Sequence, residues 1–329
     1  MKTLGLDIGG ANIKAAHSDG AAISEPFPLW RQPTHLFEHI RVANGRIGCG
    51  FDRVAVTMTA ELCDCFETKR EGVGFVLDVV DRFAEGVPVR VWSTNGGFVS
   101  VAAARAEPLK VAASNWHAWA TFAARYPGDA MIDVGSTTTD IVRRVDRQPV
   151  FNGLTDMDRL ATGELEYLGV RRTPVAALGP SVALNRTTYS VMSEFFATTA
   201  DVFVLTGDLP EAPDCLDTPD TRPLTRAFAA ARLLRMIGAD TEMSTLENAV
   251  KLAHSFHDRM LGRLERSLRQ VMGGGLPEHV LVSGSGEFFA RKLALWLEIE
   301  PIPVSEILGF DVSAAACAHA LVRLADELE

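Results

Sequence analysis

LGLDIGGANIK (Leu4–Lys14) and MIDVGSTTTDI (Met131–Ile141) share one pattern, and together they decide the fold. Each is an apolar strand that ends in Asp-x-Gly, continues through small or hydroxyl residues and returns to apolar residues. This pattern predicts a strand–turn–strand hairpin whose tip presents backbone N–H groups and hydroxyls to phosphate oxygens. The aspartates stand at the strand ends, where a carboxylate can hold Mg²⁺ directly or through water. Two such hairpins facing each other across a cleft would clamp a polyphosphate from both sides.

The two hairpins supply the predicted metal and phosphate ligands. Asp7 and Asp133 are predicted to hold Mg²⁺ and to act in catalysis. The predicted phosphate-binding residues are Gly9, Gly10, Asn12, Lys14, Gly135, Ser136, Thr137, Thr138 and Thr139. One hairpin alone would also fit an ordinary glycine-rich turn with a solvated aspartate. The repeat, with one copy opening each half of the chain, favours the functional interpretation.

A third element, Val280–Glu287, is an apolar strand that runs into a Gly-x-Gly turn and then a helix. Its backbone could approach a nucleotide or another flat ligand, and a helix N-terminus favours anionic groups. Gly284, Ser285 and Gly286 are therefore predicted to bind substrate or nucleotide. The dinucleotide-binding fingerprint is not met, because no third glycine follows at the required spacing.

Length and charge narrow the class of protein. The 329 residues predict about two domains at ~150 residues each, with the boundary between residues 1–126 and 127–329. A C-terminal helix over residues 312–329 is able to pack back on the first lobe. The net charge of −10 excludes a nucleic-acid binder, and no apolar run reaches the ~20 residues of a membrane span. Five cysteines without a CxxC motif argue against a disulfide framework, so we expect a cytoplasmic protein.

Short apolar runs alternate with amphipathic stretches, which predicts an α/β fold. The predicted strands are Thr3–Ile8, Val54–Thr57, Val89–Trp92, Ala130–Val134, Ile141–Arg144, Asp201–Leu205 and His279–Val282. The predicted helices are Glu71–Arg82, Asn115–Ala124, Arg222–Ile237, Thr245–Met272, Glu287–Leu297 and Val312–Glu329. Ser244 and Glu247 have capping-box spacing at the start of the longest helix. The proline- and aspartate-rich stretch Gly207–Pro223 is predicted to be a surface loop.

Further candidate residues follow the strand Val54–Thr57, where loop residues commonly point into an α/β cleft. Glu61 and Asp64 are candidates for the base that deprotonates a nucleophile. Thr57, Thr59 and Lys69 are predicted to contact substrate. The alternative is that these residues are solvated loop charges.

Two more pairs are candidates for the same cleft. Asn95 and Gly96 follow a strand, and the alternative is a purely structural turn. Arg171 and Arg172 are suited to bidentate phosphate binding, although surface ion pairs would explain them equally well. Trp116 is expected either in core packing or in an aromatic wall for a phenolic substrate.

The three elements, in this order, resemble the phosphate-1, phosphate-2 and adenosine motifs of the actin/sugar kinase/Hsp70 superfamily. Over most of its length the chain also resembles the short hydantoinase/oxoprolinase-like proteins linked to tetrahydromethanopterin-dependent one-carbon transfer. This resemblance rests on Asp7–Lys14, Val56–Leu62, Lys69–Val73, Asn95–Phe98, Asp133–Asp140, Gly163–Leu165 and Gly169–Val175. One departure is Ala60, where the family's TMTGE-like segment has a glycine.

The resemblance implies a two-lobed actin-like ATPase (ribonuclease H-like) fold, with mixed sheets flanked by helices and a cleft between the lobes. An archaeal member of the family is a methanofuran-biosynthesis enzyme, which joins an aminomethylfuranyl-methyl diphosphate to the phenol oxygen of a glutamyl-tyramine and releases diphosphate. Full-length hydantoinases and oxoprolinases are far longer, so their hydrolytic reactions are not implied.

The expected function is therefore a Mg²⁺-dependent transferase with a diphosphate leaving group, acting on tyrosine, tyramine or a glutamyl derivative. An ATP-dependent small-molecule kinase and a nucleotide-switched regulatory or assembly ATPase are the alternatives. The expected partner is a small-molecule substrate that carries diphosphate, with ATP and a homodimer as further options. Neither nucleic acid nor a membrane is expected.

Overall fold

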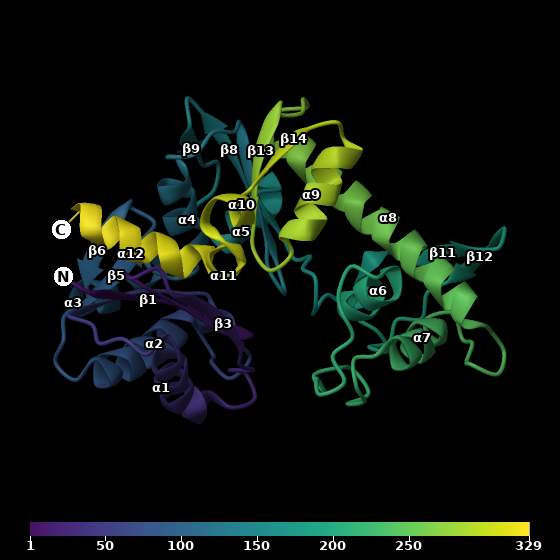
Figure 1. The fold of residues 1–329 in the computed structure, drawn as a ribbon, viewed down its shortest axis with the longest axis horizontal. Coiled ribbons are helices and arrows are strands. Elements are labelled where there is room, and N and C mark those ends of the chain that lie inside the picture. Colours follow the sequence, from purple (N-terminus) through teal and green to yellow (C-terminus); the bar gives the residue numbers. More distant parts are fainter. Residues whose placement is uncertain (329) are drawn as a thin grey trace.

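The computed structural model describes residues 1–328, which form two mixed sheets flanked by helices (Figure 1). The first sheet has the order β3 (Ala22–Pro26), β2 (Asn12–His17), β1 (Thr3–Ile8), β4 (Arg53–Met58), β5 (Val89–Ser93) and β6 (Gly97–Ser100). The second has the order β10 (Leu165–Glu166), β8 (Thr139–Val145), β7 (Ala130–Val134), β13 (His279–Ser283) and β14 (Glu300–Pro303), and β9 (Gln148–Val150) pairs with β8. A separate hairpin joins β11 (Ser181–Leu184) to β12 (Thr187–Ser190).

The two large sheets repeat one topology. In the first, β1 and β2 pair antiparallel, while β4 pairs parallel to β1 and β5 parallel to β4. In the second, β7 and β8 pair antiparallel, while β13 pairs parallel to β7 and β14 parallel to β13. The central strands β1, β4 and β7 are buried at every residue, which explains their nearly continuous apolar sequences. The predicted mixed α/β class is confirmed.

The helices cover the faces of these sheets. The longer ones are α1 (Leu36–Ile47), α2 (Lys69–Ala84), α4 (Asn115–Ala123), α7 (Arg226–Arg235), α8 (Leu246–Val271), α9 (Glu287–Trp296) and α12 (Ala316–Leu328). The shorter ones are α3 (Val101–Ala106), α5 (Asp156–Thr162), α6 (Thr199–Thr206), α10 (Val304–Leu308) and α11 (Phe310–Ala314). The chain passes from the first sheet to the second between α4 and β7, and the predicted boundary at residue 126 falls in this connection. Within residues 1–328, no helix combines the length and the apolar character needed to span a membrane.

The C-terminal helix α12 packs against the first sheet (Figure 1). Gly5 on β1 permits this approach, because a Cβ there would lie 2.3 Å from the carbonyl oxygen of Ala318. The Arg53 guanidinium donates at 2.8 Å to Asp326 on α12 and at 2.9 Å to the hydroxyl of Thr3. The predicted single helix over residues 312–329 is interrupted at Ala315, which divides it into α11 and α12, and its last predicted residue, 329, lies outside the described residues.

Two local predictions are wrong. Asp201–Leu205, predicted as a strand, lies in the buried helix α6, whose first turn is fixed by a capping box between Thr198 and Asp201. A short apolar run has no periodicity that separates a buried strand from a buried helix. At α8 the capping residue is Thr245 instead of Ser244, because the Thr245 hydroxyl accepts from the backbone N–H of Asn248.

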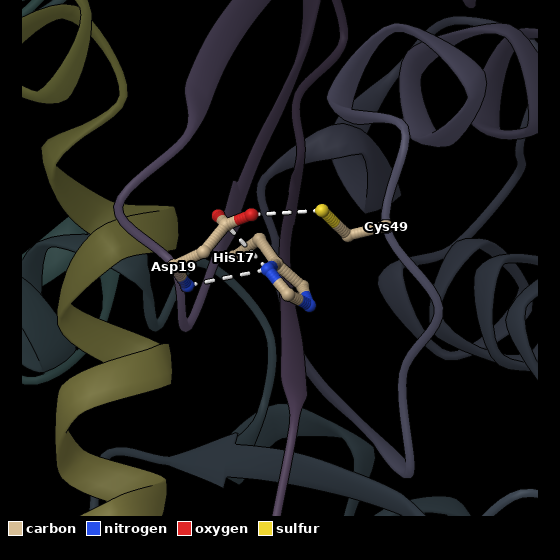
Figure 2. A group of neighbouring side chains, drawn as sticks. All are labelled: His17, Asp19 and Cys49. Atoms are coloured by element: carbon tan, nitrogen blue, oxygen red, sulfur yellow. Dashed lines mark hydrogen bonds and ion pairs between the residues drawn. The ribbon is translucent and has the colours of Figure 1, made fainter.

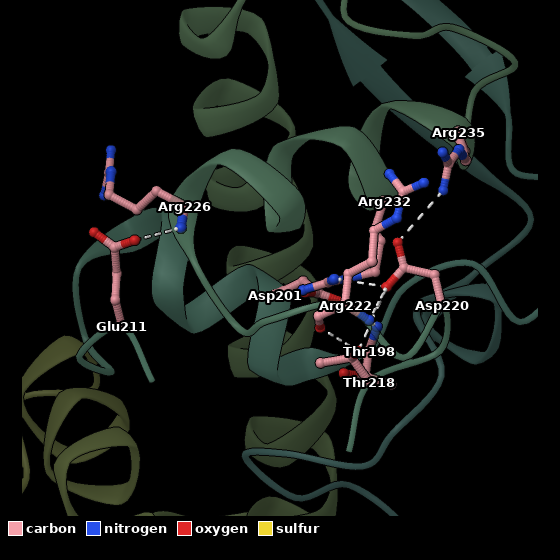
Figure 3. Close-up of polar contacts among 9 residues, drawn as sticks. All are labelled: Thr198, Asp201, Glu211, Thr218, Asp220, Arg222, Arg226, Arg232 and Arg235. Atoms are coloured by element: carbon pink, nitrogen blue, oxygen red, sulfur yellow. Dashed lines mark hydrogen bonds and ion pairs between the residues drawn. The ribbon is translucent and has the colours of Figure 1, made fainter. Parts of the chain in front are cut away.

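A buried ion pair ties α6 to α7 (Figure 3). The Arg232 side chain is fully buried and donates to Asp201 at 2.6 and 2.8 Å. It also donates at 2.8 Å to Asp220, which lies in the loop predicted for residues 207–223. Burial raises the pKa of Asp201, and Arg232 opposes that effect. Because both side chains are buried, removing Arg232 would leave Asp201 as an uncompensated buried charge.

Candidate active site

A cleft of about 410 Å³ lies between the turns of the two sheets, within the size range of small-molecule sites. Both predicted hairpins line it, together with the loops that follow β3, β4 and β10. The predicted residues that line the cleft are Asp7, Gly9, Gly10, Asn12, Lys14, Thr59, Asp64, Gly135, Ser136, Thr137, Thr138 and Arg172. The cleft therefore collects most of the predicted phosphate-binding residues.

The two hairpin turns have the same internal geometry and touch each other. In the first, the N–H of Gly9 donates at 2.9 Å to the carbonyl of Asn12, and in the second Gly135 donates at 2.8 Å to Thr138. The Asn12 side-chain amide then donates at 2.7 Å to the hydroxyl of Ser136, which joins the lobes.

Backbone amides at both turn tips are unused. Within residues 1–328, the N–H groups of Gly10, Ala11, Ser136 and Thr137 donate no hydrogen bond. Successive free N–H groups of this kind form concavities that bind anions. Gly169 packs closely against the second turn, and only glycine fits there, since a Cβ would lie 2.4 Å from the nitrogen of Thr137.

Buried charges gather at the base of the two turns. Lys14 Nζ lies 3.6 Å from Asp7 Oδ2, and the other Asp7 oxygen is buried without a hydrogen-bond partner. Burial raises the pKa of Asp7, while Lys14 lowers it. Burial likewise raises the pKa of Asp133 to about 6. Lys14 and the Ser283 hydroxyl, which donates a hydrogen bond to Asp133, act to lower this pKa. Lys14 itself has a raised pKa, because Asp7 and the neighbouring carboxylates outweigh the effect of burial.

These residues fit a Mg²⁺ ion that shares its coordination with a substrate. The unpartnered Asp7 oxygen is a ready ligand, and Asp133 ends the matching strand. Among the described residues, the cleft contains no three carboxylates close enough to enclose an ion by themselves. Mg²⁺ commonly takes one or two carboxylates and completes its shell with phosphate oxygens and water.

A second group of charges stands beside the cleft. Glu61 lies in a short turn after β4, with its side chain 1% exposed and both carboxylate oxygens without a hydrogen-bond partner. Burial raises its pKa to about 7, although Lys69 Nζ at 3.7 Å acts to lower it. Lys69 also contacts Asp156 at 2.6 Å, and Asp156 lines the cleft from the other lobe. Lys69 thereby forms a second bridge between the lobes.

Arginine guanidinium groups stack on two tryptophan rings in the cleft lining. The Arg159 guanidinium lies 3.7 Å from the centre of the Trp116 ring and donates at 2.8 Å to Asp140. The Arg172 guanidinium lies 3.8 Å from the centre of the Trp30 ring. Such stacking fixes the planar guanidinium groups. Trp116 is only 2% exposed and belongs to the core, as the first of its two predicted roles required.

Other predicted residues lie outside the cleft lining. Thr57 is buried and shares a 2.9 Å hydrogen bond with Ser114, and Thr139 donates to the carbonyl of Leu168. Asp133, Glu61 and Lys69 are not part of the cleft lining either. Asn95, Gly96 and Arg171 are also absent from the lining.

The Gly-x-Gly turn after β13 packs against β7 and also lies outside the lining. The N–H of Gly286 donates at 2.8 Å to Val134, and that of Gly284 donates at 3.2 Å to Ser313. A Cβ on Gly284 would lie 2.2 Å from the Val134 carbonyl oxygen. Its amides are thus used within the protein, and Ser285 between them does not line the cleft.

Sequence reasoning missed several residues of the cleft. Asp140 lies inside the repeated motif, so the motif could have identified it as a cleft residue. Trp30, Asp156, Arg159 and Tyr167 belong to no motif, and they reach the cleft only through the fold.

The structure has the two-lobed actin-like ATPase fold, and solved structures agree. With a TM-score of 0.50, the chain resembles the nucleotide-free structure of acetone carboxylase at 10% identity, over 97% of this chain and 70% of that one. It resembles the PilM–PilN type IV pilus biogenesis complex with a TM-score of 0.50 at 14% identity, over 97% and 98% of the two chains. At such identities the likeness concerns the fold alone.

Residues 52–326 match the family described as Hydantoinase/oxoprolinase, and the chain belongs to this family. A relative from Methanocaldococcus jannaschii is 33% identical over 98% of this chain and 96% of its own length. It is named (4-{4-[2-(gamma-L-glutamylamino)ethyl]phenoxymethyl}furan-2-yl)methanamine synthase. A protein of the same name from Methanococcus vannielii is 28% identical over 60% of this chain and 91% of its own length.

Proposed function

We propose that this protein is an enzyme of methanofuran-type cofactor biosynthesis that forms an aryl ether between a furanylmethyl carbon and a phenol oxygen. The names of both relatives describe a product with this phenoxymethyl-furan linkage. The observation that carries the proposal is the pair of Asp-x-Gly turns, joined through Asn12 and Ser136, with their unused amides facing one cleft.

The turns would hold the diphosphate of a furanylmethyl diphosphate. Lys14 supplies positive charge beside Asp7, and the free amides of Gly10 and Ser136 are placed for phosphate oxygens. Mg²⁺, held by Asp7 and Asp133, would neutralise charge that develops on the departing diphosphate. Donors fixed in advance around a leaving oxygen lower the barrier because they need no rearrangement during the reaction.

The reaction forms one bond and breaks one. The phenol oxygen attacks the methylene carbon, the C–O bond to diphosphate breaks with its electron pair leaving on diphosphate, and the furan ring delocalises positive charge at the carbon. Trp30, which is partly exposed in the cleft lining, offers aromatic surface for a flat ring, whereas Trp116 is buried beneath Arg159. Holding the reactants in place can contribute ~7–11 kcal/mol.

The phenol proton would pass to the group formed by Asp156, Lys69 and Glu61. Asp156 lines the cleft, Lys69 contacts both carboxylates, and the pKa of Glu61 is raised to about 7. A proton accepted at Asp156 can be relayed through the Lys69 ammonium and held on Glu61 near neutral pH. A base with a pKa near the working pH is suited to a phenol, whose reference pKa is ~10. Asp64, which lines the same cleft, is the second candidate for this role.

The test is a reaction of the purified full-length protein with an aminomethylfuranyl-methyl diphosphate, Mg²⁺ and a glutamyl-tyramine, without ATP. We expect the aryl ether by mass spectrometry and one diphosphate for each ether formed. Omission of any one component should abolish both products. An absolute requirement for ATP, or phosphate transfer to the phenol, would establish a kinase instead.

A further inference from the structure

Three side chains that can bind a metal meet at the far end of the first sheet (Figure 2). His17 ends β2, Asp19 lies in the turn to β3, and Cys49 follows α1. Within residues 1–328, theirs is the one group of three His, Cys, Asp or Glu side chains whose ligand atoms lie within 4.8 Å of one another. The reaction proposed above uses none of these residues.

The local backbone brings the three together. Helix α1 ends at Gly48, whose φ of 74° turns the chain in a left-handed conformation and places Cys49 beside the sheet. Gly20, with a φ of 97°, closes the turn after Asp19. Both positions favour glycine, so the approach of the two segments is encoded in the sequence.

The ligand atoms are already close. The Cys49 thiol donates at 2.7 Å to one Asp19 oxygen, and the other Asp19 oxygen lies 2.9 Å from His17 Nδ1. A tetrahedral Zn²⁺ with bonds of about 2.0–2.3 Å places its ligand atoms about 3.3–3.8 Å apart. A small outward movement of the exposed Asp19 side chain would open the space for the ion.

One tautomer of His17 is suited to binding a metal. Its Nε2 lies 3.2 Å from the carbonyl oxygen of Gly50, which can only accept, so Nε2 carries the hydrogen. In this tautomer Nδ1 accepts at 3.2 Å from the Asp19 N–H, and a cation between Nδ1 and the Asp19 oxygen 2.9 Å away would remove the repulsion between them. The ring is buried, and a ligating histidine held through its second nitrogen by a carbonyl is the usual arrangement around bound metals.

We propose that His17, Asp19 and Cys49 form a binding site for a thiophilic divalent cation of the Zn²⁺ class. One nitrogen, one oxygen and one sulfur ligand suit such an ion and do not suit Mg²⁺, which prefers oxygen alone. On binding, the cation replaces the thiol proton that Cys49 now donates to Asp19, and that proton leaves to solvent. The exposed side of Asp19 leaves a fourth position for water.

The site would join the β2–β3 turn to the end of α1. The site lies at the opposite end of β2 from Asn12. This strand has six residues and spans about 20 Å. Metal binding there is thus separate from the cleft, and the inference does not rest on the proposed reaction. Its effect would be on the stability of the first lobe.

The test uses Co²⁺ as a spectroscopic probe on the reduced full-length protein, with Mg²⁺ in excess to occupy sites made of oxygen ligands alone. We expect one equivalent of Co²⁺ to give a thiolate-to-cobalt charge-transfer band, and Zn²⁺ to displace it. Cys49→Ser should abolish the band. Cys215→Ser, which removes a free thiol of similar burial in the other lobe, should retain it.

A second variant tests the site independently of whether Cys49→Ser folds. Asp19→Asn keeps the shape of an exposed side chain and should weaken Zn²⁺ binding at least tenfold, with the fold of the metal-free protein intact by circular dichroism. Zn²⁺ should raise the melting temperature of the wild type and leave that of Cys49→Ser unchanged. A charge-transfer band that survives Cys49→Ser, or wild-type Zn²⁺ affinity in Asp19→Asn, would overturn the proposal.

Discussion

Asn12 and Ser136 join the two lobes directly, through a 2.7 Å hydrogen bond between the tips of two matching turns. The residues are 124 positions apart in the sequence. Asn12 lies three residues after Gly9, and Ser136 lies one residue after Gly135, the glycine that begins the matching turn. The contact sets how far apart the two sets of phosphate-binding amides lie. A ligand that bridges both turns therefore depends on it.

Loss of this contact is expected to weaken substrate binding. Asn12→Ala and Ser136→Ala should each raise KM for the diphosphate substrate about 2–12-fold, the equivalent of one hydrogen bond of ~0.5–1.5 kcal/mol. The double variant should cost less than the product of the two, because the partners act through one bond. Asn185→Ala, which breaks an exposed amide pair with Asn248 in the second lobe, is the control and should leave KM unchanged. If the two effects on KM multiply fully, Asn12 and Ser136 act independently and their hydrogen bond does not contribute to substrate binding.

Asp133 is expected to act through charge. Asp133→Asn should lower kcat by ~10²–10³-fold, the usual cost of losing one electrostatic stabiliser, with the fold intact by circular dichroism. The exposed Asp81→Asn on α2 is the matched control and should have wild-type turnover. Wild-type turnover in Asp133→Asn would remove this residue from the site.

The pH dependence of the reaction is expected to report Glu61. Its raised pKa of about 7 means that the carboxylate ionises only as the pH rises through neutrality. Because a base acts in its ionised form, kcat/KM should increase with pH up to about 7 and level off above it. Glu61→Gln should abolish this rise and lower the plateau by ~10²–10⁴-fold, whereas the exposed Glu67→Gln should keep the wild-type profile. An unchanged profile in Glu61→Gln would assign the proton to another group.

The cleft is expected to prefer diphosphate to ATP. Mg²⁺ with inorganic diphosphate should raise the melting temperature at least as much as Mg²⁺ with ATP, since saturation at 100 times Kd adds ~2.7 kcal/mol. Lys14→Met should abolish the diphosphate shift, because it removes the cation nearest the two turns. A large shift with ATP and none with diphosphate would favour a nucleotide-dependent reaction.

The sequence predicts the hairpins well because their signals are local. An apolar strand, an aspartate and a glycine within a few residues specify the turn geometry seen at Gly9 and at Gly135. The repeat of that pattern was enough to predict two matching hairpins that face each other across a cleft. The same local reasoning misassigned Asp201–Leu205, where burial in a helical layer overrode the β-branched residues.

The rest of the cleft depends on contacts between distant segments. Trp30 is carried there by the loop after β3, where Leu29 donates to the carbonyl of Gly10. Asp156 is brought in by its ion pair with Lys69 across the lobes. The glycines at 284 and 286 were misleading for a different reason, since close backbone packing and ligand contact both call for glycine.

The position of the phenol oxygen in the products distinguishes aryl ether formation from phosphate transfer to the phenol. In a reaction with ¹⁸O-labelled glutamyl-tyramine, furanylmethyl diphosphate and Mg²⁺ but no ATP, mass spectrometry would locate the label. We expect ¹⁸O in the ether, unlabelled diphosphate, and one diphosphate for each ether. Label in a phosphate ester of the phenol, or no ether until ATP is added, would contradict the proposed reaction.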